Sequence, residues 1–317
     1  MPAPMFSSRQ HRTIGHVFRT IRSEHRPRFA TDISDPSRFR SFVIDGEANF
    51  VNMPRPTHAM HRFANPARFL RLSAALRPWA LGVALLTLVA GLWLALFDSP
   101  PDYQQGETVR IMYIHVPSAW TAMMVYATMA AASAVGLVWK HPVAELYTKA
   151  AAPLGAGFTA LCLLSGSLWG QPMWGTWWVW DARLTSVLIL FFIYLGYIVL
   201  VSAFDDPQRG LGAGAVLTLV GAVNLPIIKF SVDWWNTLHQ PASVMRLGGS
   251  SLDPSMLWPL LVMAIAFTAL FVWLVLLRTE TEIAERRIRA LRLTTAMVAA
   301  GRGAGGEEVP GLRRLAG

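Results

Sequence analysis

Six apolar segments, each near the length of a membrane-spanning helix, constrain the fold of this chain more than any other feature of its sequence. A helix of ~20 apolar residues crosses the hydrocarbon core of a bilayer and satisfies its own backbone polar groups on the way. Of the 317 residues, 53% are hydrophobic and only 15% are charged, which is typical of integral membrane proteins. We therefore predict an all-α integral membrane protein with six transmembrane helices, at about residues 78–97, 118–139, 150–169, 184–204, 211–228 and 256–277.

The distribution of Lys and Arg around these segments predicts how the chain crosses the membrane. Cations gather on one side, which the positive-inside rule assigns to the cytoplasm, so both termini are predicted to be cytoplasmic. That side carries Arg55, Arg62, Arg68, Arg71, Arg77, Lys140, Lys149, Arg209, Arg278, Arg286, Arg287, Arg289 and Arg292, and the other side carries Arg110, Arg183, Lys229 and Arg246. The net charge of +9 is then explained by contact with anionic membrane lipid rather than with nucleic acid.

The composition divides the chain into three predicted domains. They are a polar, basic cytoplasmic extension at 1–77, a six-span membrane domain at 78–277, and a cytoplasmic basic amphipathic helix with a disordered tail at 278–317. The extension lacks the apolar region of a signal peptide. One hypothesis is that translation starts at Met53 or Met60 and that residues 1–52 are a gene-start artefact or a disordered tail. Mass spectrometry of the native N-terminus tests this, and an intact peptide from residues 1–52 would contradict it.

Three residues inside the apolar segments differ from their surroundings. Cys162 is the single cysteine, which excludes an internal disulfide, a Cys-x-x-Cys thiol-exchange pair and the Cys-x-x-Cys-His attachment site of c-type haem. We expect Cys162 to be a small buried apolar residue. In the fifth segment, the polar Asn224 and the helix-breaking Pro226 are expected to face protein rather than lipid.

Tryptophan is concentrated in residues 169–186, which read WGQPMWGTWWVWDARLTS. Gly170, Pro172 and Gly175 interrupt this stretch, so we expect no regular helix through it and predict a loop at the outer membrane surface. An indole is a large flat apolar surface with one N–H that prefers a polar partner. Aromatic belts account for isolated tryptophans, but this density favours a platform for a flat apolar ligand that carries charge. The platform would consist of Trp169, Trp174, Trp177, Trp178 and Trp180.

Two histidines, His115 and His239, fall in outer loops on the same predicted side as the tryptophan stretch. Imidazole is a common axial ligand of haem iron, and two histidines from separate loops can clamp a porphyrin from opposite faces. A lone histidine at an interface is more often a hydrogen-bonded anchor. The prediction of a ligand pair therefore depends on both histidines and the tryptophans lying on one face.

Charged residues near the tryptophan stretch have two interpretations each. Arg183 or Arg110 could pair with a haem propionate, whereas Arg183 considered alone would more often contact a lipid headgroup. Asp181 could orient a histidine or indole N–H. It could equally cap the fourth helix, because it lies just before Leu184, where an N-cap is expected.

The tryptophan stretch resembles the WWD signature of haem-handling membrane proteins, and specifically that of the haem exporter protein C (CcmC) family of cytochrome c maturation. The resemblance covers about residues 77–292 and includes IMYIHVPSAW before the second segment and NTLHQPAS after the fifth. WWD proteins that perform the final haem attachment are longer and have more spans, so length favours the CcmC family. The long extension at 1–77 departs from the family pattern and bears on the start site.

The resemblance implies that His115 and His239 are axial ligands of haem b and that the tryptophan stretch holds the ring at the periplasmic face of a bacterial inner membrane. It also implies a haem lyase-like activity that promotes covalent attachment of haem to the chaperone CcmE, although no residue here is an evident acid, base or nucleophile. The other implied partners are the ABC transporter subunits CcmA and CcmB and the small membrane protein CcmD. ATP use would belong to a partner, because the chain has no G-x-x-x-x-G-K-[ST] motif.

Two alternative functions fit the same sequence. A permease would move haem or another solute through the bundle, and it is expected to place polar residues at mid-membrane depth, where few beyond Asn224 occur. A structural scaffold with an aromatic belt would be colourless after purification, and His115→Ala and His239→Ala would then be silent.

Overall fold

The fold is all-helical across the part of the chain described by the computed structural model, which is residues 65–241, 243–244 and 248–304. Its helices are α3 (Pro66–Trp93), α4 (Met112–Trp139), α5 (Pro142–Trp174), α6 (Ala182–Ser202), α7 (Pro207–Gly221), α8 (Asn224–Trp234) and α9 (Pro254–Ala304), with a π-helical turn η2 (Leu94–Asp98) and a 3-10 turn η3 (Glu107–Ile111). The hypotheses about residues 1–52 and about the end of the tail lie outside the described residues.

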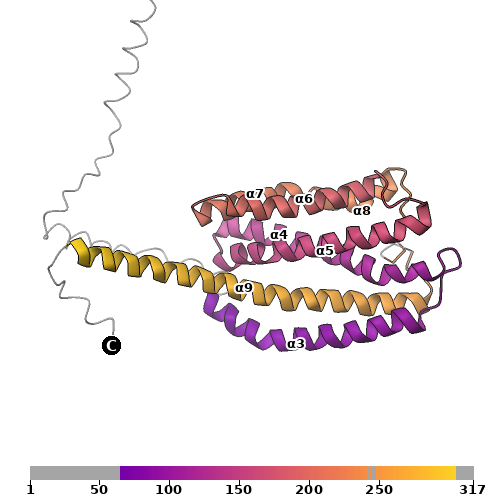
Figure 1. The fold of residues 1–317 in the computed structure, drawn as a ribbon, viewed down its shortest axis with the longest axis horizontal. Coiled ribbons are helices and arrows are strands. Elements are labelled where there is room, and N and C mark those ends of the chain that lie inside the picture. The colour runs from indigo at the N-terminus through magenta and orange to yellow at the C-terminus, as the bar shows by residue number, and fades with distance from the viewer. Residues whose placement is uncertain (1–64, 242, 245–247, 305–317) are drawn as a thin grey trace, which may run out of the picture. The chain divides into compact units, whose positions relative to one another are not determined.

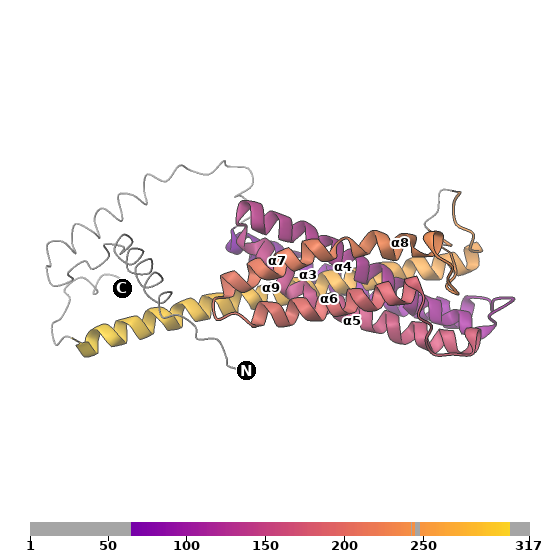
Figure 2. The same ribbon diagram turned by 90° about the horizontal axis from the view of Figure 1, so that it is seen from above.

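Within the described residues, six spans are long and apolar enough to cross a membrane, which confirms the predicted fold class. In chain order, the spans are formed by α3 continued by η2, by η3 continued by α4, by α5, by α6, by α7 together with α8, and by α9. Because successive spans run in opposite directions, the connections at 99–106, 175–181 and 235–253 meet at one end of the bundle (Figure 1). α9 projects from the opposite end (Figure 2). The assignment of these ends to cytoplasm and periplasm stays a prediction.

The middle of the bundle is closed by large buried side chains whose polar atoms are satisfied within the protein. α4 packs against α5, α7 and α9, while α6 packs against α5, α7 and α8. Tyr126 and Tyr194 donate hydrogen bonds to the carbonyl oxygens of Thr218 and Ala122, at 3.0 and 2.8 Å. Tyr197 donates to a threonine hydroxyl of α5. Burial of a tyrosine ring is favourable where its hydroxyl finds such a partner, so this layer separates the two ends of the bundle.

The fifth span is broken where proline chemistry requires it. Pro226 has no N–H, and its ring crowds the carbonyl of the residue four positions earlier, Ala222. The helix is interrupted at Ala222 and Val223, between α7 and α8. Asn224 is buried and its amide donates to the Ser186 carbonyl oxygen at 2.9 Å, as expected. The expectation for Pro226 is wrong, because this residue is exposed on the outside of the bundle.

Several helix ends differ from the sequence prediction because helices extend beyond their apolar cores. The predicted loop at 140–149 is mostly the first turns of α5, which starts at Pro142, where the missing N–H is harmless. The same helix continues through Pro172 to Trp174, so the first third of the tryptophan stretch is helical, contrary to expectation. Gly175, with φ +75°, then ends α5 and donates its amide to the Gln171 carbonyl oxygen.

The C-terminal helix is longer than its apolar span. The predicted basic helix at 278–292 is helical and continuous with the sixth span, but α9 extends to Ala304, into the region predicted to be disordered. Near the bundle, α9 is tied to its neighbours by ion pairs of Glu280 with Arg77 and of Glu282 with Lys149. Beyond these pairs nearly all of its described side chains are exposed.

Candidate functional site

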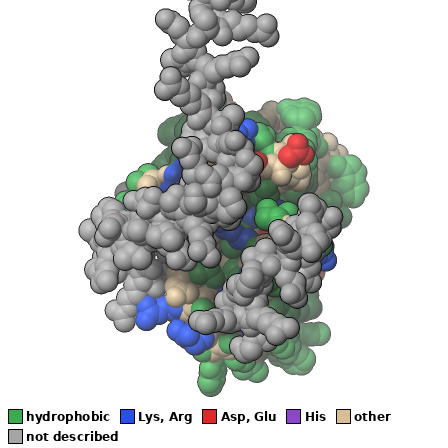
Figure 3. Space-filling model, turned by 90° about the vertical axis from the view of Figure 1, so that its left-hand side faces the viewer, with side chains coloured by type: hydrophobic (Ala, Val, Ile, Leu, Met, Phe, Trp, Pro, Cys, Tyr) green, Lys and Arg blue, Asp and Glu red, His purple; other side chains and the backbone are tan. Residues whose placement is uncertain are grey.

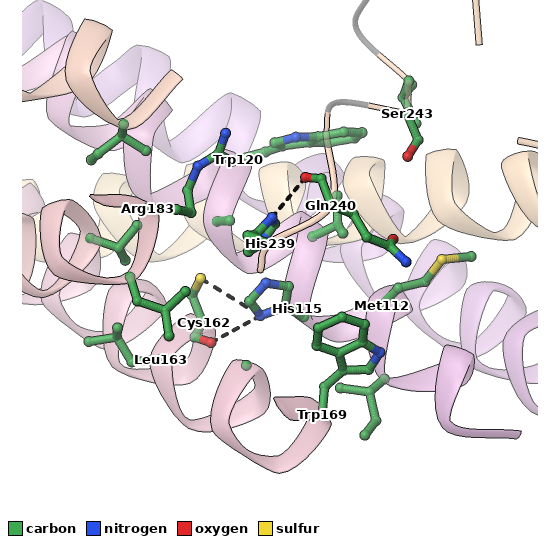
Figure 4. A pocket seen from close by; sticks show the side chains of 18 of the residues that line it. Met112, His115, Trp120, Cys162, Leu163, Trp169, Arg183, His239, Gln240 and Ser243 are labelled. Carbon is green, nitrogen blue, oxygen red and sulfur yellow. Dashed lines mark hydrogen bonds between the residues drawn. The ribbon is translucent and has the colours of Figure 1, made fainter. Parts of the chain in front are cut away.

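A cavity of about 250 Å³ lies at the end of the bundle where the connections 99–106, 175–181 and 235–253 meet. Its walls come from α4, α5 and α6, and the connection 235–253 covers one side (Figure 4). Six of the predicted site residues line it: His115, Trp169, Trp174, Trp178, Arg183 and His239. The structure therefore brings together side chains from five separate elements: α4, α5, the connection 175–181, α6 and the connection after α8.

His115 and His239 face each other across this cavity. Their ring centroids are 6.3 Å apart with the planes tilted by 38°. Two imidazoles that bind one metal through ring nitrogens, with bonds of about 2.0 Å, hold their ring centres about 6 Å apart. The observed spacing thus fits a single metal centre between the rings, and His115 reaches it from the first turns of α4 rather than from a loop.

Both imidazoles have Nδ1 against a backbone carbonyl oxygen, at 3.0 Å from Cys162 for His115 and 2.9 Å from Gln240 for His239 (Figure 4). A carbonyl oxygen only accepts hydrogen bonds, so each Nδ1 must carry the proton. In the neutral ring, Nε2 then keeps its lone pair. The backbone therefore fixes, for both histidines, the tautomer that can ligate a metal through Nε2.

The imidazole of His115 is also fixed by a close approach to α5. A Cβ added at Gly166 would lie 3.0 Å from Cε1 and 3.4 Å from Nδ1 of His115, closer than ordinary van der Waals contact. Ser165 supports the same ring, with Oγ 3.2 Å from Nδ1. The absence of a side chain at Gly166 allows the imidazole to rest against the helix backbone.

His239 is held through its backbone by Thr237, which is itself bonded to Asp181 of the tryptophan stretch. The Thr237 hydroxyl donates to Asp181 Oδ2 and accepts from the His239 amide at 3.0 Å. Asp181 Oδ1 also accepts from the Leu184 amide at 2.7 Å and so caps α6. The predicted helix cap is therefore confirmed, whereas the link from Asp181 to His239 runs through Thr237 to the backbone and not to the imidazole.

The environment of His239 favours its neutral form. Burial lowers the pKa of His239 below its ordinary value of 6.5; the Gln240 carbonyl opposes this, Arg183 lowers the pKa further, and Asp181 raises it. Desolvation disfavours the charged imidazolium. At neutral pH the ring is therefore uncharged, as metal ligation requires.

Three indoles form one wall of the cavity. Trp169 donates its Nε1–H to Gln105 Oε1 at 2.8 Å and meets Trp174 edge to face, with centroids 5.1 Å apart. Trp178 also lines the cavity, and its Nε1 is one of the buried side-chain polar atoms that lack a hydrogen-bond partner in the described part of the chain. An unsatisfied buried donor costs free energy, which an acceptor that reached this N–H would remove.

The other two indoles of the predicted platform do not line the cavity. Trp177 and Trp180 are 58% and 78% exposed. Trp180 packs edge to face against Trp178, with centroids 5.5 Å apart. Their exposed rings are open to lipid headgroups or to a partner.

The two candidate arginines have different surroundings. Arg183 lines the cavity, where its Nε donates to Ser231 Oγ at 2.7 Å and its Nη2 to the Lys229 carbonyl oxygen at 3.4 Å. These bonds link α6 to α8. Arg183 lies close enough to His239 to lower the pKa of its imidazole, and Figure 4 shows both residues in the cavity. Arg110 is paired with Glu107 and donates to the Ala95 carbonyl oxygen, and it is not among the lining residues. Of these two arginines, Arg183 is therefore the one placed to meet a charged ligand group.

Sequence reasoning missed three contributors to the site. Trp120, five residues after His115 on α4, lines the cavity, and no i,i+3 or i,i+4 relation to His115 points to it. Gln105 is the partner of Trp169 and lies in a connection that composition marks only as a turn. Cys162 is buried as predicted, but its carbonyl group orients His115, and no side-chain pattern reveals a backbone role.

The site can hold a metal only if other ligands complete its coordination. Within residues 65–304, apart from the positions not described, no group of three or more His, Cys, Asp or Glu side chains is placed to hold a metal ion. Two imidazoles leave most coordination positions of a transition metal open. A porphyrin supplies four nitrogen ligands in a plane and leaves two axial positions, which a histidine pair fills. The aromatic wall suits such a flat ring.

Fold and site define a multi-pass helical membrane protein with a histidine pair and an indole-lined cavity at one end of its bundle. The family model described as Heme exporter protein C (CcmC) matches residues 59–294. The chain belongs to this family.

The relatives of the chain cover most of its membrane domain. It is 63% identical over 233 residues to Heme exporter protein C of Bradyrhizobium diazoefficiens, covering 74% of this chain and 88% of that protein. The identity is 48% over 224 residues with the protein of that name from Haemophilus influenzae, covering 71% and 91%. It is 47% over 220 residues with that of Escherichia coli K12, covering 69% and 88%.

Proposed function

We propose that this protein binds haem b at the periplasmic face of a bacterial inner membrane and presents it to the chaperone CcmE for covalent attachment during c-type cytochrome biogenesis. The observation that carries the proposal is the pair of Nε2-available imidazoles, with centroids 6.3 Å apart, beside an indole wall. The names of the relatives state export of haem. The chain would work beside CcmA, CcmB and CcmD, in a multi-pass membrane assembly.

Each part of haem has a matching group in the cavity. His115 and His239 would occupy the two axial positions of the iron, and Trp169, Trp174 and Trp178 would pack on the ring. The propionates are carboxylates, and a guanidinium pairs strongly with such groups. Arg183 and the unpartnered Nε1–H of Trp178 would be two of the donors for them.

The size of the cavity supports presentation rather than full enclosure. Pockets that enclose drug-sized ligands measure roughly 300–1,000 Å³, and this cavity measures about 250 Å³. A haem held between the histidines would therefore keep an edge outside the protein. An exposed edge is what a chaperone needs in order to form a covalent bond to haem, and the chemistry of that bond would lie on the chaperone, since this cavity presents no evident nucleophile.

A permease remains the alternative, but the interior gives it little support. The buried layer of Tyr126, Tyr194 and Tyr197 lies between the two ends of the bundle, and the hydroxyls are used within the protein. A conduction path needs polar groups that face an open route. Presentation at one end requires no such route.

Haem attachment to the chaperone tests the proposal. The protein and CcmE are co-expressed in cells that lack their own copies, and haem that stays on CcmE after denaturing electrophoresis is stained. We expect labelling with the wild type and with Gly157→Ala, a change at an exposed α5 position with nothing near the added Cβ. We expect at least about tenfold less labelling with His239→Ala at equal membrane abundance.

Two results would contradict the proposal. Full labelling of CcmE with each of the variants His115→Ala and His239→Ala would show that haem attachment does not require the histidine pair. Uptake of haem into vesicles that contain only the purified protein, unchanged in these variants, would favour the permease.

A further inference from the structure

A second cavity, of about 350 Å³, lies at the opposite end of the bundle, between the last turns of α4 and the first turns of α5 and α7. Figure 3 looks toward this end and shows Lys and Arg side chains gathered on it. Small residues of α4 and α7 leave the space open, namely Ala132, Gly136, Gly212 and Ala215. The cavity is separate from the histidine pair, which is near the start of α4.

The mouth of this cavity carries charges of both signs. Lys140, the C-cap of α4, and Arg209, in the first turn of α7, are exposed cations. Arg209 Nε is 3.5 Å from Asp206 Oδ2. Glu145 lies on the α5 side, and Gln208 donates to its Oε2 at 3.0 Å. A purely anionic ligand would meet this carboxylate unfavourably, so the mouth suits a group that contains both a phosphate and a cation.

The interior of the cavity contains one unused hydrogen-bonding group. Ser133 is 2% exposed, and its Oγ lacks a hydrogen-bond partner among the described residues. It lies two helical turns inward from Lys140, at the level of Ala132 and Ala215, and lines the cavity. A buried hydroxyl without a partner costs free energy, and an ester carbonyl that reached this side chain would satisfy it.

We propose that this cavity binds one glycerophospholipid with a zwitterionic, ammonium-bearing headgroup, such as phosphatidylethanolamine. Its phosphate lies between Lys140 and Arg209, its ammonium group donates to Glu145, and a glycerol ester carbonyl accepts from Ser133. The acyl chain covers the apolar wall formed by Leu137 and Leu211, which a free phosphate would leave exposed. This inference does not depend on the haem proposal.

Gly212 provides a selective variant for the test. Gly212 lines the cavity and a Cβ added there meets nothing within 4 Å, so we expect a leucine at this position to occupy part of the cavity. Gly157→Leu is the matched control, because it makes the same change at an exposed helix position with equal free space. Lys140→Gln combined with Arg209→Gln removes the phosphate partners and leaves the cavity open.

The experiment is native mass spectrometry of the full chain, delipidated in mild detergent and titrated with phosphatidylethanolamine, phosphatidylcholine or phosphatidylglycerol, with and without inorganic phosphate. We expect one phosphatidylethanolamine adduct on the wild type and on Gly157→Leu, and at least about tenfold weaker binding to Gly212→Leu and to the double variant. Phosphatidylcholine, whose headgroup has no N–H, should bind more weakly, and inorganic phosphate should not displace the adduct.

Three outcomes would overturn the proposal. The first is equal phosphatidylethanolamine binding to the wild type and to Gly212→Leu. The second is displacement of the lipid by inorganic phosphate, which would indicate a simple anion site. The third is tighter binding of phosphatidylglycerol than of phosphatidylethanolamine, which would exclude the role of Glu145. Unchanged thermal unfolding of each variant in detergent excludes a folding defect.

Discussion

His115 on α4 and His239 in the connection after α8 lie with ring centroids 6.3 Å apart, each with Nδ1 against a backbone carbonyl oxygen. The pair is assembled from two rigid supports. α5 holds one imidazole through Cys162 and Gly166, and the Asp181–Thr237 contact holds the backbone of the other. Variants of the supporting residues can therefore displace an imidazole without removing it.

Gly166→Ala is expected to weaken haem binding by displacing His115. The added Cβ would lie 3.0 Å from Cε1 of the imidazole, so the ring must move away from its Cys162 carbonyl partner. We expect a loss of about tenfold in haem affinity, measured by titration of purified protein, with little change for Gly157→Ala on the same helix. Equal affinities of these two variants would show that the contact with α5 does not position His115.

Thr237→Val is expected to loosen His239 without removing it. The substitution keeps the shape of the side chain but breaks the hydrogen bonds to Asp181 and to the His239 amide. Because a bond to a charged group contributes ~1.5–3 kcal/mol, we expect haem to dissociate about tenfold faster, as measured by transfer to an excess of an apo-globin. Thr268→Val makes the same change on an exposed face of α9 and should have no effect. An unchanged dissociation rate in Thr237→Val would contradict the positioning role.

Trp178→Phe is expected to affect the haem-free and haem-loaded protein in opposite ways. The variant keeps an aromatic ring but removes the buried Nε1–H that lacks a partner. Loss of an unsatisfied donor removes a cost of ~1–3 kcal/mol, so the haem-free protein should unfold at an equal or higher temperature. Haem affinity should fall, because a donor to the propionates is lost. Trp180→Phe, at a position 78% exposed, serves as the control for both measurements. An affinity equal to that of the wild type would exclude this donor role.

The stability of the folded protein is expected to depend on pH through the protonation of His239. Burial holds its pKa below 6.5 in the folded protein, while the unfolded chain titrates near 6.5. Its contribution is therefore fully present above pH 6.5 and decreases as the pH falls through 6.5 toward the folded pKa. The midpoint of thermal unfolding of haem-free protein should drop more between pH 7.5 and 5.5 in the wild type than in His239→Gln. An equal or smaller drop in the wild type than in His239→Gln would show that protonation of His239 does not cause the loss of stability.

The sequence predicted the membrane spans and predicted that His115, His239 and the tryptophan stretch lie at one end of the bundle. It did not predict how these side chains are arranged there. Hydropathy located every span because the bilayer imposes a length and a composition on each. The sequence analysis underestimated the length of α5, because Gly170 and Pro172 indicated a loop. A proline in the last turn of a helix removes only one backbone hydrogen bond, so the helix continues through Pro172. The sequence analysis also predicted that Pro226 faces protein. The helix break that Pro226 causes lies one turn earlier, at Ala222, and Pro226 itself is exposed.

The division of the tryptophan stretch into two groups could not be predicted from the sequence. Trp177 and Trp178 are neighbours in a connection without regular periodicity, and only one of them lines the cavity. The contributions of Cys162 and Gln240 are also invisible in the sequence, because they act through backbone carbonyl oxygens. Their placement depends on how α5 and the connection 235–253 pack against α4.

The visible absorption spectrum of detergent-purified protein, expressed with haem supplied, tests most directly that haem lies between His115 and His239. The account predicts a Soret band of six-coordinate, low-spin haem in the wild type. It predicts a weaker or shifted band in both His115→Ala and His239→Ala, with recovery of the wild-type band when free imidazole is added. No Soret band in the wild type, or identical bands in all three proteins, would contradict the account.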